Sequence, residues 1–242
     1  MKNGFLLPKG DKMIGIIAAM DEEVSAVLKQ MQDIKEQSIY DYVFYTGKLN
    51  NQNITITKSG VGKVQAAMAT TIMLTNYPLK GIINVGIAGG LSPKLKVCDV
   101  VIADKVAQWD FDLTAFDYQK GFNNERYTFF ANQNEVLQLK EKMKTDQHVF
   151  VGPMVTGDQF IYNQKLINEI KAAYPEALCA DMEAGAIAQV AKYHHLPFLI
   201  IRSISDVTGD DGNENVFEDL IKSACQVAAE YCYLAVGILA SL

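Results

Sequence analysis

Short apolar runs alternate with amphipathic segments along most of the chain. Residues 13–20 (MIGIIAAM), 81–85 and 197–203 (PFLIIRS) are apolar runs rich in β-branched side chains, which predicts strands buried on both faces of a sheet. Residues 21–31 and 63–76 carry apolar or alanine positions at helical spacing, so each is expected to form a helix. Strands that alternate with helices predict an α/β fold with a largely parallel or mixed sheet.

The other segments extend this pattern. Residues 50–52 (NNQ) are expected to join two strands in a hairpin. The further expected elements are strands at 40–49, 53–58, 100–107, 149–156 and 178–182, helices at 135–144, 163–174, 184–193 and 216–239, and irregular structure at 108–127. No linker, repeat or low-complexity segment interrupts residues 13–242. They are expected to form one domain after a short tail at residues 1–12.

The charge balance argues against polyanionic partners. The 242 residues include 28 acidic and 22 basic side chains, a formal net charge of −6, and only Arg126 and Arg202 among the basic residues are arginines. A nucleic-acid partner is therefore not expected, and an arginine-built phosphate clamp is disfavoured. No apolar run reaches the roughly 18 residues of a membrane span. The four cysteines lack paired spacing, so we expect free thiols and a cytoplasmic protein.

Acidic side chains follow three separate strands of the predicted sheet. Glu23, Glu183 and Asp206 each come shortly after a strand, and Phe160 follows a fourth. Active sites of open α/β sheets lie beyond the carboxyl ends of the strands, so these residues are expected to converge. Each also has a purely structural interpretation. Glu23 and Glu183 could favour a helix start through its dipole, Asp206 could cap a turn, and Phe160 could belong to the core.

Converging carboxylates suit the cleavage of a glycosidic bond. The transition state of that reaction resembles an oxocarbenium ion, and carboxylates stabilise its growing positive charge. Asp206 is the candidate acid, because burial behind the apolar strand at 197–203 would raise the pKa of its carboxyl group. Glu23 could position water, Glu183 could accept hydrogen bonds from a sugar diol, and the Phe160 ring offers a face to a planar base. The residues alone make nucleoside cleavage one possible chemistry.

Motifs for other chemistries are weak or absent. Residues 86–90 (GIAGG) follow a strand but lack the spacing of a dinucleotide-binding loop. The sequence contains no Walker loop and no G-x-S-x-G motif. His148, His194 and His195 lack the spacing of metal ligands. Neither a metal nor a cofactor is expected.

Seven stretches, in order along the chain, resemble the 5'-methylthioadenosine/S-adenosylhomocysteine nucleosidases of the nucleoside phosphorylase-like superfamily. They are IGIIAAMDEEV at 14–24, KSGVGKV at 58–64, NVGIAGGL at 84–91, LTAF at 113–116, VTGDQFI at 155–161, DMEA at 181–184 and RSISD at 202–206. The resemblance implies a three-layer α/β/α fold with a mixed central sheet. It also implies hydrolysis of methylthioadenosine, adenosylhomocysteine and 5'-deoxyadenosine to adenine and a 5-substituted ribose, in methionine salvage and the activated methyl cycle.

The resemblance assigns roles to matching positions. It implies that Glu23 holds the attacking water, that Asp206 donates a proton to purine N7, and that Glu183 binds the ribose hydroxyls. The other implied substrate-binding positions are Val61, Ile87, Gly89, Phe160, Ile161, Met182, Arg202, Ser205 and Phe217. A second subunit completes the pocket in this family. A homodimer is therefore implied, with Leu113, Phe116 and Tyr118 near the interface.

The chain departs from the family pattern at two places. Ile87 stands where the family commonly has serine or threonine, so a hydroxyl that would orient Asp206 is missing. Residues 121–126 lack the proline-containing stretch that covers the 5' substituent in some relatives. The preference between methylthio and homocysteinyl tails therefore stays open.

Three alternatives stand beside this activity. A purine nucleoside phosphorylase of the same fold would need a phosphate clamp, where this chain has acidic residues at 21–23. A non-catalytic nucleoside-binding or storage protein would be expected to lose one of Glu23, Glu183 or Asp206, and all three are present. A nucleosidase for aminodeoxyfutalosine is the third alternative, since relatives of this kind exist.

Overall fold

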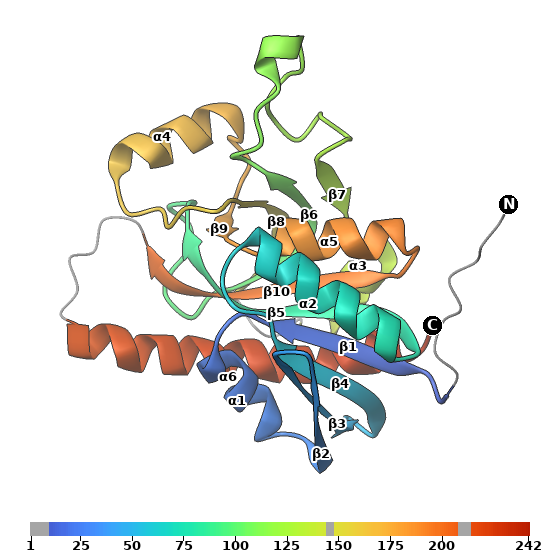
Figure 1. Cartoon of the computed structure of the whole chain (residues 1–242). Coiled ribbons are helices and arrows are strands. Elements are labelled where there is room, and N and C mark those ends of the chain that lie inside the picture. Colours follow the sequence, from blue (N-terminus) through green and yellow to red (C-terminus); the bar gives the residue numbers. More distant parts are fainter. Residues whose placement is uncertain (1–9, 144–147, 208–213) are drawn as a thin grey trace, which may run out of the picture.

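Within the part of the chain that the structure describes, a ten-stranded mixed sheet is flanked by helices (Figure 1). The computed structural model describes residues 10–143, 148–207 and 214–242, without the side chains of 207 and 214–218. The strands are β1 (Met13–Ala18), β2 (Gln32–Ile39), β3 (Tyr42–Leu49), β4 (Gln52–Lys58), β5 (Leu79–Gly90), β6 (Val100–Gln108), β7 (Thr128–Phe130), β8 (Val149–Thr156), β9 (Cys179–Asp181) and β10 (Phe198–Val207). The helices are α1 (Asp21–Leu28), α2 (Lys63–Asn76), α3 (Gln133–Lys142), α4 (Gln164–Ala173), α5 (Ala184–Tyr193) and α6 (Glu214–Leu239), with a short 3-10 helix, η1 (Thr114–Phe116). The expected α/β class is confirmed.

The long strand β5 connects the two halves of the sheet. On one side it is parallel to β1, and β4, β3 and β2 follow outward. On the other side it is parallel to β10, and the pairs β10–β6, β6–β8, β8–β9 and β9–β5 close a ring of strands. Gly89 therefore pairs with Asp206 of β10 and with Ala180 of β9. The end of β5 therefore lies between the end of β10 and the strand β9.

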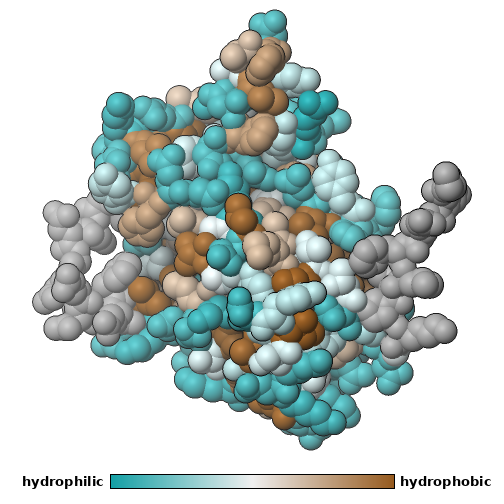
Figure 2. Space-filling model, viewed as in Figure 1, coloured by the Kyte–Doolittle hydropathy of each residue, from teal (hydrophilic) through white to brown (hydrophobic). Residues whose placement is uncertain are grey.

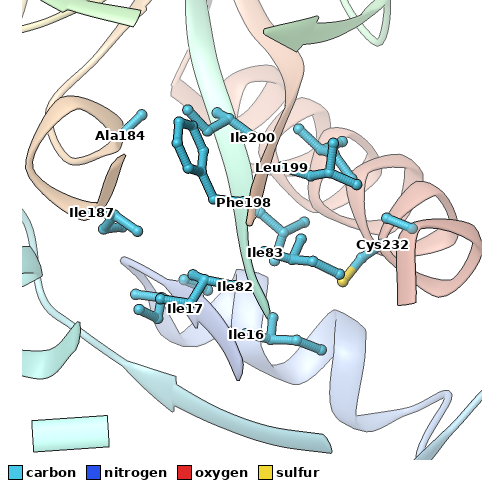
Figure 3. Close-up of a cluster of buried hydrophobic side chains, with 14 of the residues drawn as sticks. Ile16, Ile17, Ile82, Ile83, Ala184, Ile187, Phe198, Leu199, Ile200 and Cys232 are labelled. Carbon is cyan, nitrogen blue, oxygen red and sulfur yellow. The ribbon is translucent and has the colours of Figure 1, made fainter. Parts of the chain in front are cut away.

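Apolar side chains alternate between the two faces of the central strands. Figure 3 shows one set on the side of α5 and another on the side of Cys232 in α6. The first set is Ile17, Ile82, Phe198 and Ile200 with Ala184 and Ile187, and the second is Ile16, Ile83 and Leu199. Strands buried on both faces need apolar residues at successive positions, which explains the continuous runs in the sequence.

Helices cover both faces of this sheet. On one face, α6 packs on β5 and β10 and also contacts α1 and α3; on the other, α2 and α5 pack together (Figure 1). The result is a three-layer α/β/α arrangement, as the resemblance implies. Within the described residues, no helix is both long enough and apolar enough to cross a membrane.

The sequence-based expectations miss some strand structure. β2 was not expected, because its residues are mostly polar and exposed and an exposed edge strand lacks the alternation that reveals a half-buried one. Helix α1 ends at Leu28 instead of continuing to residue 31. β7 was not expected either; it directly follows the stretch at 108–127, which was expected to be irregular. β5 and β10 extend to Gly90 and Val207, beyond the apolar runs that predicted them, because they continue to pair with each other.

Candidate active site

A cavity of about 200 Å³ lies where the end of β5 meets β9 and β10. Its wall contains most of the residues singled out from the sequence: Glu23, Val61, Ile87, Gly89, Phe160, Ile161, Met182, Glu183, Ser205 and Asp206. The other lining residues are Ala19, Met20, Ala88, Leu91, Gln159, Ala180 and Asp181. The wall is largely apolar, with carboxyl groups supplied by separate elements. Such a concave site is the form expected of a small-molecule pocket.

Main-chain amides hold Glu23 in the cavity wall. Its Oε2 accepts hydrogen bonds from the N–H groups of Ala19 (2.7 Å) and Met20 (3.0 Å), and its Oε1 accepts one from Ile87 (2.9 Å). Gly86 permits this approach, because a Cβ there would lie 2.3 Å from Glu23 Oε1. Glu23 thus does more than favour the start of α1: it joins the ends of β1 and β5.

Glu183 connects the start of α5 with the start of α2. Its Oε1 accepts a hydrogen bond from the Gly62 N–H (2.9 Å), and its side chain makes no capping hydrogen bond to α5 among the described residues. Gly62 has a φ of 101°, which glycine adopts far more readily than other residues. Glu183, the residue just before α5, therefore also holds the turn that leads into α2.

Burial controls the charge of both glutamates. It raises the pKa of Glu23, against the lowering effects of the Arg202 charge and of the three main-chain hydrogen bonds. It also raises the pKa of Glu183 to about 8; the negative charge of Asp181 adds to this shift and Arg202 opposes it. Burial therefore favours the protonated form of both groups, and Glu183 can exchange a proton near neutral pH with little change in free energy.

Asp206 lies within β10, opposite Gly89 of β5, and not in a turn. The Ser205 hydroxyl donates a hydrogen bond to Asp206 Oδ1 (2.6 Å) and also lies 3.3 Å from the Ala88 carbonyl oxygen. Ser205 thus supplies a hydroxyl to Asp206 in a chain that has isoleucine at position 87. A Cβ on Gly89 would lie 3.6 Å from Asp206 Oδ2, so the glycine leaves this face of the carboxyl group open to the cavity.

Arg202 does not line the cavity, in contrast to what the resemblance implies. It is 2% exposed, and its guanidinium donates to Asp181 Oδ2, to Asn84 Oδ1 and to the Ile201 carbonyl. A buried guanidinium needs such partners; Asp181 provides them from the cavity wall and Asn84 from behind it. Sequence reasoning assigned no role to Asn84 and no partner to Asp181. The available signal was an arginine within the most apolar strand, which requires a buried acid nearby.

The remaining predicted residues lie away from the cavity, or their side chains are outside the described part of the structure. Leu113, Phe116 and Tyr118 belong to the segment between β6 and β7, which projects from the body of the protein (Figure 1, top). Phe116 is 72% exposed. The side chain of Phe217 lies outside the described residues. The described residues include no cluster of histidine, cysteine and acidic side chains that could hold a metal ion.

Comparison with known proteins gives consistent matches over most of the chain. The family described as the phosphorylase superfamily matches residues 13–240. The 5'-methylthioadenosine/S-adenosylhomocysteine nucleosidase of Oceanobacillus iheyensis is 39% identical over 219 residues, which cover 90% of this chain and 95% of that protein. The protein of the same name from Marinomonas sp. is 37% identical over 217 residues, or 88% of this chain and 94% of that protein.

Solved structures of the same kind share the fold. The nucleosidase of S. pneumoniae, solved with a transition-state inhibitor, has a TM-score of 0.85 and 34% identity, and the match covers 94% of this chain and 99% of that chain. The enzyme of Neisseria meningitidis, in complex with methylthio-immucillin-A, has the same TM-score with 32% identity, over 95% and 99% of the two chains. The chain therefore belongs to the phosphorylase superfamily and, within it, to the 5'-methylthioadenosine/S-adenosylhomocysteine nucleosidases.

Proposed function

We propose that the protein hydrolyses the N-glycosidic bond of 5'-methylthioadenosine and S-adenosylhomocysteine, and of 5'-deoxyadenosine as well. The products are adenine and the 5-substituted ribose. The observation that carries this proposal is the meeting of Glu23, Glu183 and Asp206 around one largely apolar cavity. An apolar wall accommodates a purine and a thioether, and the carboxyl groups supply the acid–base chemistry.

Each carboxyl group has a distinct part in this reaction. Glu23 takes a proton from a water molecule, whose oxygen bonds to the anomeric carbon as the bond to the purine breaks. The hydrogen bonds from Ala19, Met20 and Ile87 fix the orientation of the Glu23 carboxylate. Glu183 accepts hydrogen bonds from the ribose hydroxyls. In their ionised forms, which the charge of Arg202 favours, Glu23 and Glu183 also stabilise the oxocarbenium-like transition state.

The leaving group is handled on the other side of the cavity. Asp206 donates a proton to N7 of the departing purine, and the Ser205 hydroxyl holds its carboxyl group in place. Phe160 stacks on the base, Ile161 reads the base edge through its main chain, and Met182 packs against the ribose. Arg202 acts from behind the wall, where its charge favours the ionised forms of both glutamates.

Water is the nucleophile in this proposal, because the cavity offers no clamp for phosphate. None of the described residues that line it is a lysine, arginine or histidine. Arg202 donates its hydrogen bonds to Asp181 and Asn84 instead. A phosphate ion would meet Glu23 and Glu183 without a compensating guanidinium, which disfavours a phosphorylase.

We further propose a cytoplasmic homodimer in which the partner completes the pocket with Leu113, Phe116 and Tyr118. Support comes from exposed apolar residues that continue from the cavity mouth onto α2: Val61, Val64, Met68, Phe160 and Tyr162. Figure 2 shows hydrophobic residues gathered over the part of the surface where α2 lies. Patches of this kind mark protein–protein contacts. Analytical ultracentrifugation should give a dimer, and Phe116→Asp should shift it towards monomer; a monomeric wild type would refute the homodimer.

The substrate assignment is tested by an assay of adenine release in phosphate-free buffer. Methylthioadenosine, adenosylhomocysteine and 5'-deoxyadenosine are compared at equal concentration. We expect adenine from each of them. Absence of adenine from all three would refute the proposal, and release from only one would limit it to that substrate.

A further inference from the structure

Three loops meet at a charged cluster beside the cavity. The cluster consists of Lys63 at the start of α2, Asp110 after β6 and Asp158 after β8, and we call it the Lys63 cluster. Lys63 Nζ lies 2.6 Å from Asp110 Oδ1 and 3.8 Å from Asp158 Oδ2. The side chains of Lys63 and Asp110 are only 16% and 14% exposed. The Lys63–Asp110 pair is therefore well shielded and holds its geometry better than an exposed pair does, whereas the side chain of Asp158 is 46% exposed.

Main-chain hydrogen bonds reinforce the same three connections. Asp158 Oδ1 accepts a hydrogen bond from the Lys63 N–H (2.7 Å), and Asp110 Oδ2 accepts one from the Asp158 N–H (2.8 Å). Asp158 thereby caps the first turn of α2 from another loop, where a negative charge is favoured by the helix dipole. Gly62 fits closely here, since a Cβ would lie 3.3 Å from Asp158 Oδ1.

The cluster connects the residues that face the base with those that face the sugar. Asp158 is two residues before Phe160 in the loop after β8, and Lys63 follows Val61 and Gly62, whose N–H binds Glu183. Phe160 is 63% exposed, so packing alone does not fix its loop. By contrast, Glu23 and Asp206 lie on α1 and β10, and their hydrogen bonds involve none of the three charged residues.

We infer that Lys63 is a positioning residue, whose charge on Asp110 and Asp158 holds the Phe160 loop against the start of α2 at the width that a purine nucleoside needs. This inference rests on the proposed nucleosidase function and adds a determinant of substrate affinity to it. Loss of the ammonium group leaves two neighbouring carboxylates, which repel each other and move the Phe160 loop outward. Affinity for the base then falls, while the groups that act on the glycosidic bond stay in place.

The test compares Lys63→Met with Lys63→Arg, which keeps the charge. For Lys63→Met we expect KM for methylthioadenosine and the Kd for adenine to rise about tenfold while kcat stays within about threefold, the signature of lost ground-state binding. Lys63→Arg should stay near wild type in both constants. Lys58→Met is the matched control, because it removes a lysine from an exposed pair with Asp21, and it should change nothing.

A double variant separates repulsion from a general structural role. Asp158→Asn keeps the acceptor for the Lys63 N–H but removes a negative charge, so Lys63→Met/Asp158→Asn should recover part of the affinity that Lys63→Met loses. Unchanged KM and adenine Kd in a folded Lys63→Met protein would overturn the inference. If Lys63→Met does not fold, an unchanged adenine Kd in Asp158→Asn would overturn it. Adenine binding by calorimetry is independent of turnover, so an inactive wild type would count against the proposed function and not against the role of Lys63.

Discussion

The two sides of the cavity are built in different ways. On the side of Glu23, the carboxylate is 4% exposed and held by three main-chain N–H groups at the ends of β1 and β5. On the side of Phe160, the ring is 63% exposed and its loop is held by the Lys63 cluster. Bond cleavage needs groups fixed to fractions of an ångström, whereas substrate entry needs a wall that can open. The groups that act on the bond are therefore fixed at the ends of the sheet strands, whereas the base is bound by a loop.

The largest effects are expected when the acid–base groups themselves are changed. Asp206→Asn keeps the shape and hydrogen bonding of the side chain but removes the proton that the leaving purine needs. We expect kcat to fall by about 10²–10⁴, with the melting temperature unchanged. The control is Glu22→Gln, which changes an exposed acid next to Glu23 and should keep full activity. Near-normal turnover of Asp206→Asn would remove Asp206 from its proposed role.

A second large effect is expected from a change that leaves every carboxyl group present. In Gly86→Ala, the new Cβ would lie 2.3 Å from Glu23 Oε1, so the carboxylate must move away from the Ile87 N–H. We expect kcat to fall by about 10²-fold, because misplacement of about 1 Å has this effect, while the Kd for adenine changes little. Gly81→Ala on the same strand is the control, since its Cβ meets the flexible end of Leu239 at 3.2 Å. Equal activity of the two variants would show that Glu23 is not held as tightly as its contacts indicate.

On the side of Phe160, the expected effect is smaller and concerns the affinity for the substrate. Phe160→Leu keeps an apolar side chain but removes the aromatic face for the base. Because base–aromatic stacking contributes about 1–3 kcal/mol, we expect KM to rise about tenfold or more and kcat to change less. Phe130→Leu on β7 replaces another exposed phenylalanine (54% exposed) and should have no effect. A fall in kcat with unchanged KM would place Phe160 with the chemical groups instead.

The smallest effect is expected on stability and depends on pH. The pKa of Glu183 is raised from 4.5 to about 8. Between pH 4.5 and pH 8, its carboxyl group is therefore ionised in the unfolded chain but still protonated in the folded protein. Stability contributed by the protonated form is therefore lost as pH rises through this window. Glu183→Gln removes the penalty and should melt like wild type at pH 5 but about 2–4 °C higher at pH 8, the shift that about 1 kcal/mol produces at this size. Differential scanning fluorimetry at both pH values measures it, and an identical difference at pH 5 and pH 8 would contradict the burial argument.

Sequence patterns predicted the buried parts of the fold better than its surface. The apolar runs at β1 and β10 predicted these strands correctly, because strands buried on both faces need apolar residues at successive positions. β2 was missed because its side chains face water and carry no period. The meeting of Glu23, Glu183 and Asp206 at one cavity was also predicted, because the carboxyl ends of the strands in an α/β sheet lie at the same edge.

Contacts between distant segments could not be predicted in the same way. The hydrogen bond from Gly62 to Glu183 joins positions 121 residues apart, and nothing in either local sequence indicates the partner. The same holds for Arg202, whose partners Asp181 and Asn84 become visible only when β5, β9 and β10 are placed together. Such pairs are fixed by tertiary geometry, so one sequence shows the residues but not their pairing.

Water as the nucleophile is tested most directly by following methylthioadenosine cleavage with and without inorganic phosphate. Adenine is measured by chromatography and any sugar phosphate by ³¹P NMR. We predict equal rates of adenine release in the two buffers and no sugar-phosphate resonance, because Arg202 is committed to Asp181 and Asn84. Adenine release only in the presence of phosphate, together with a sugar 1-phosphate signal, would contradict hydrolysis and identify a phosphorylase.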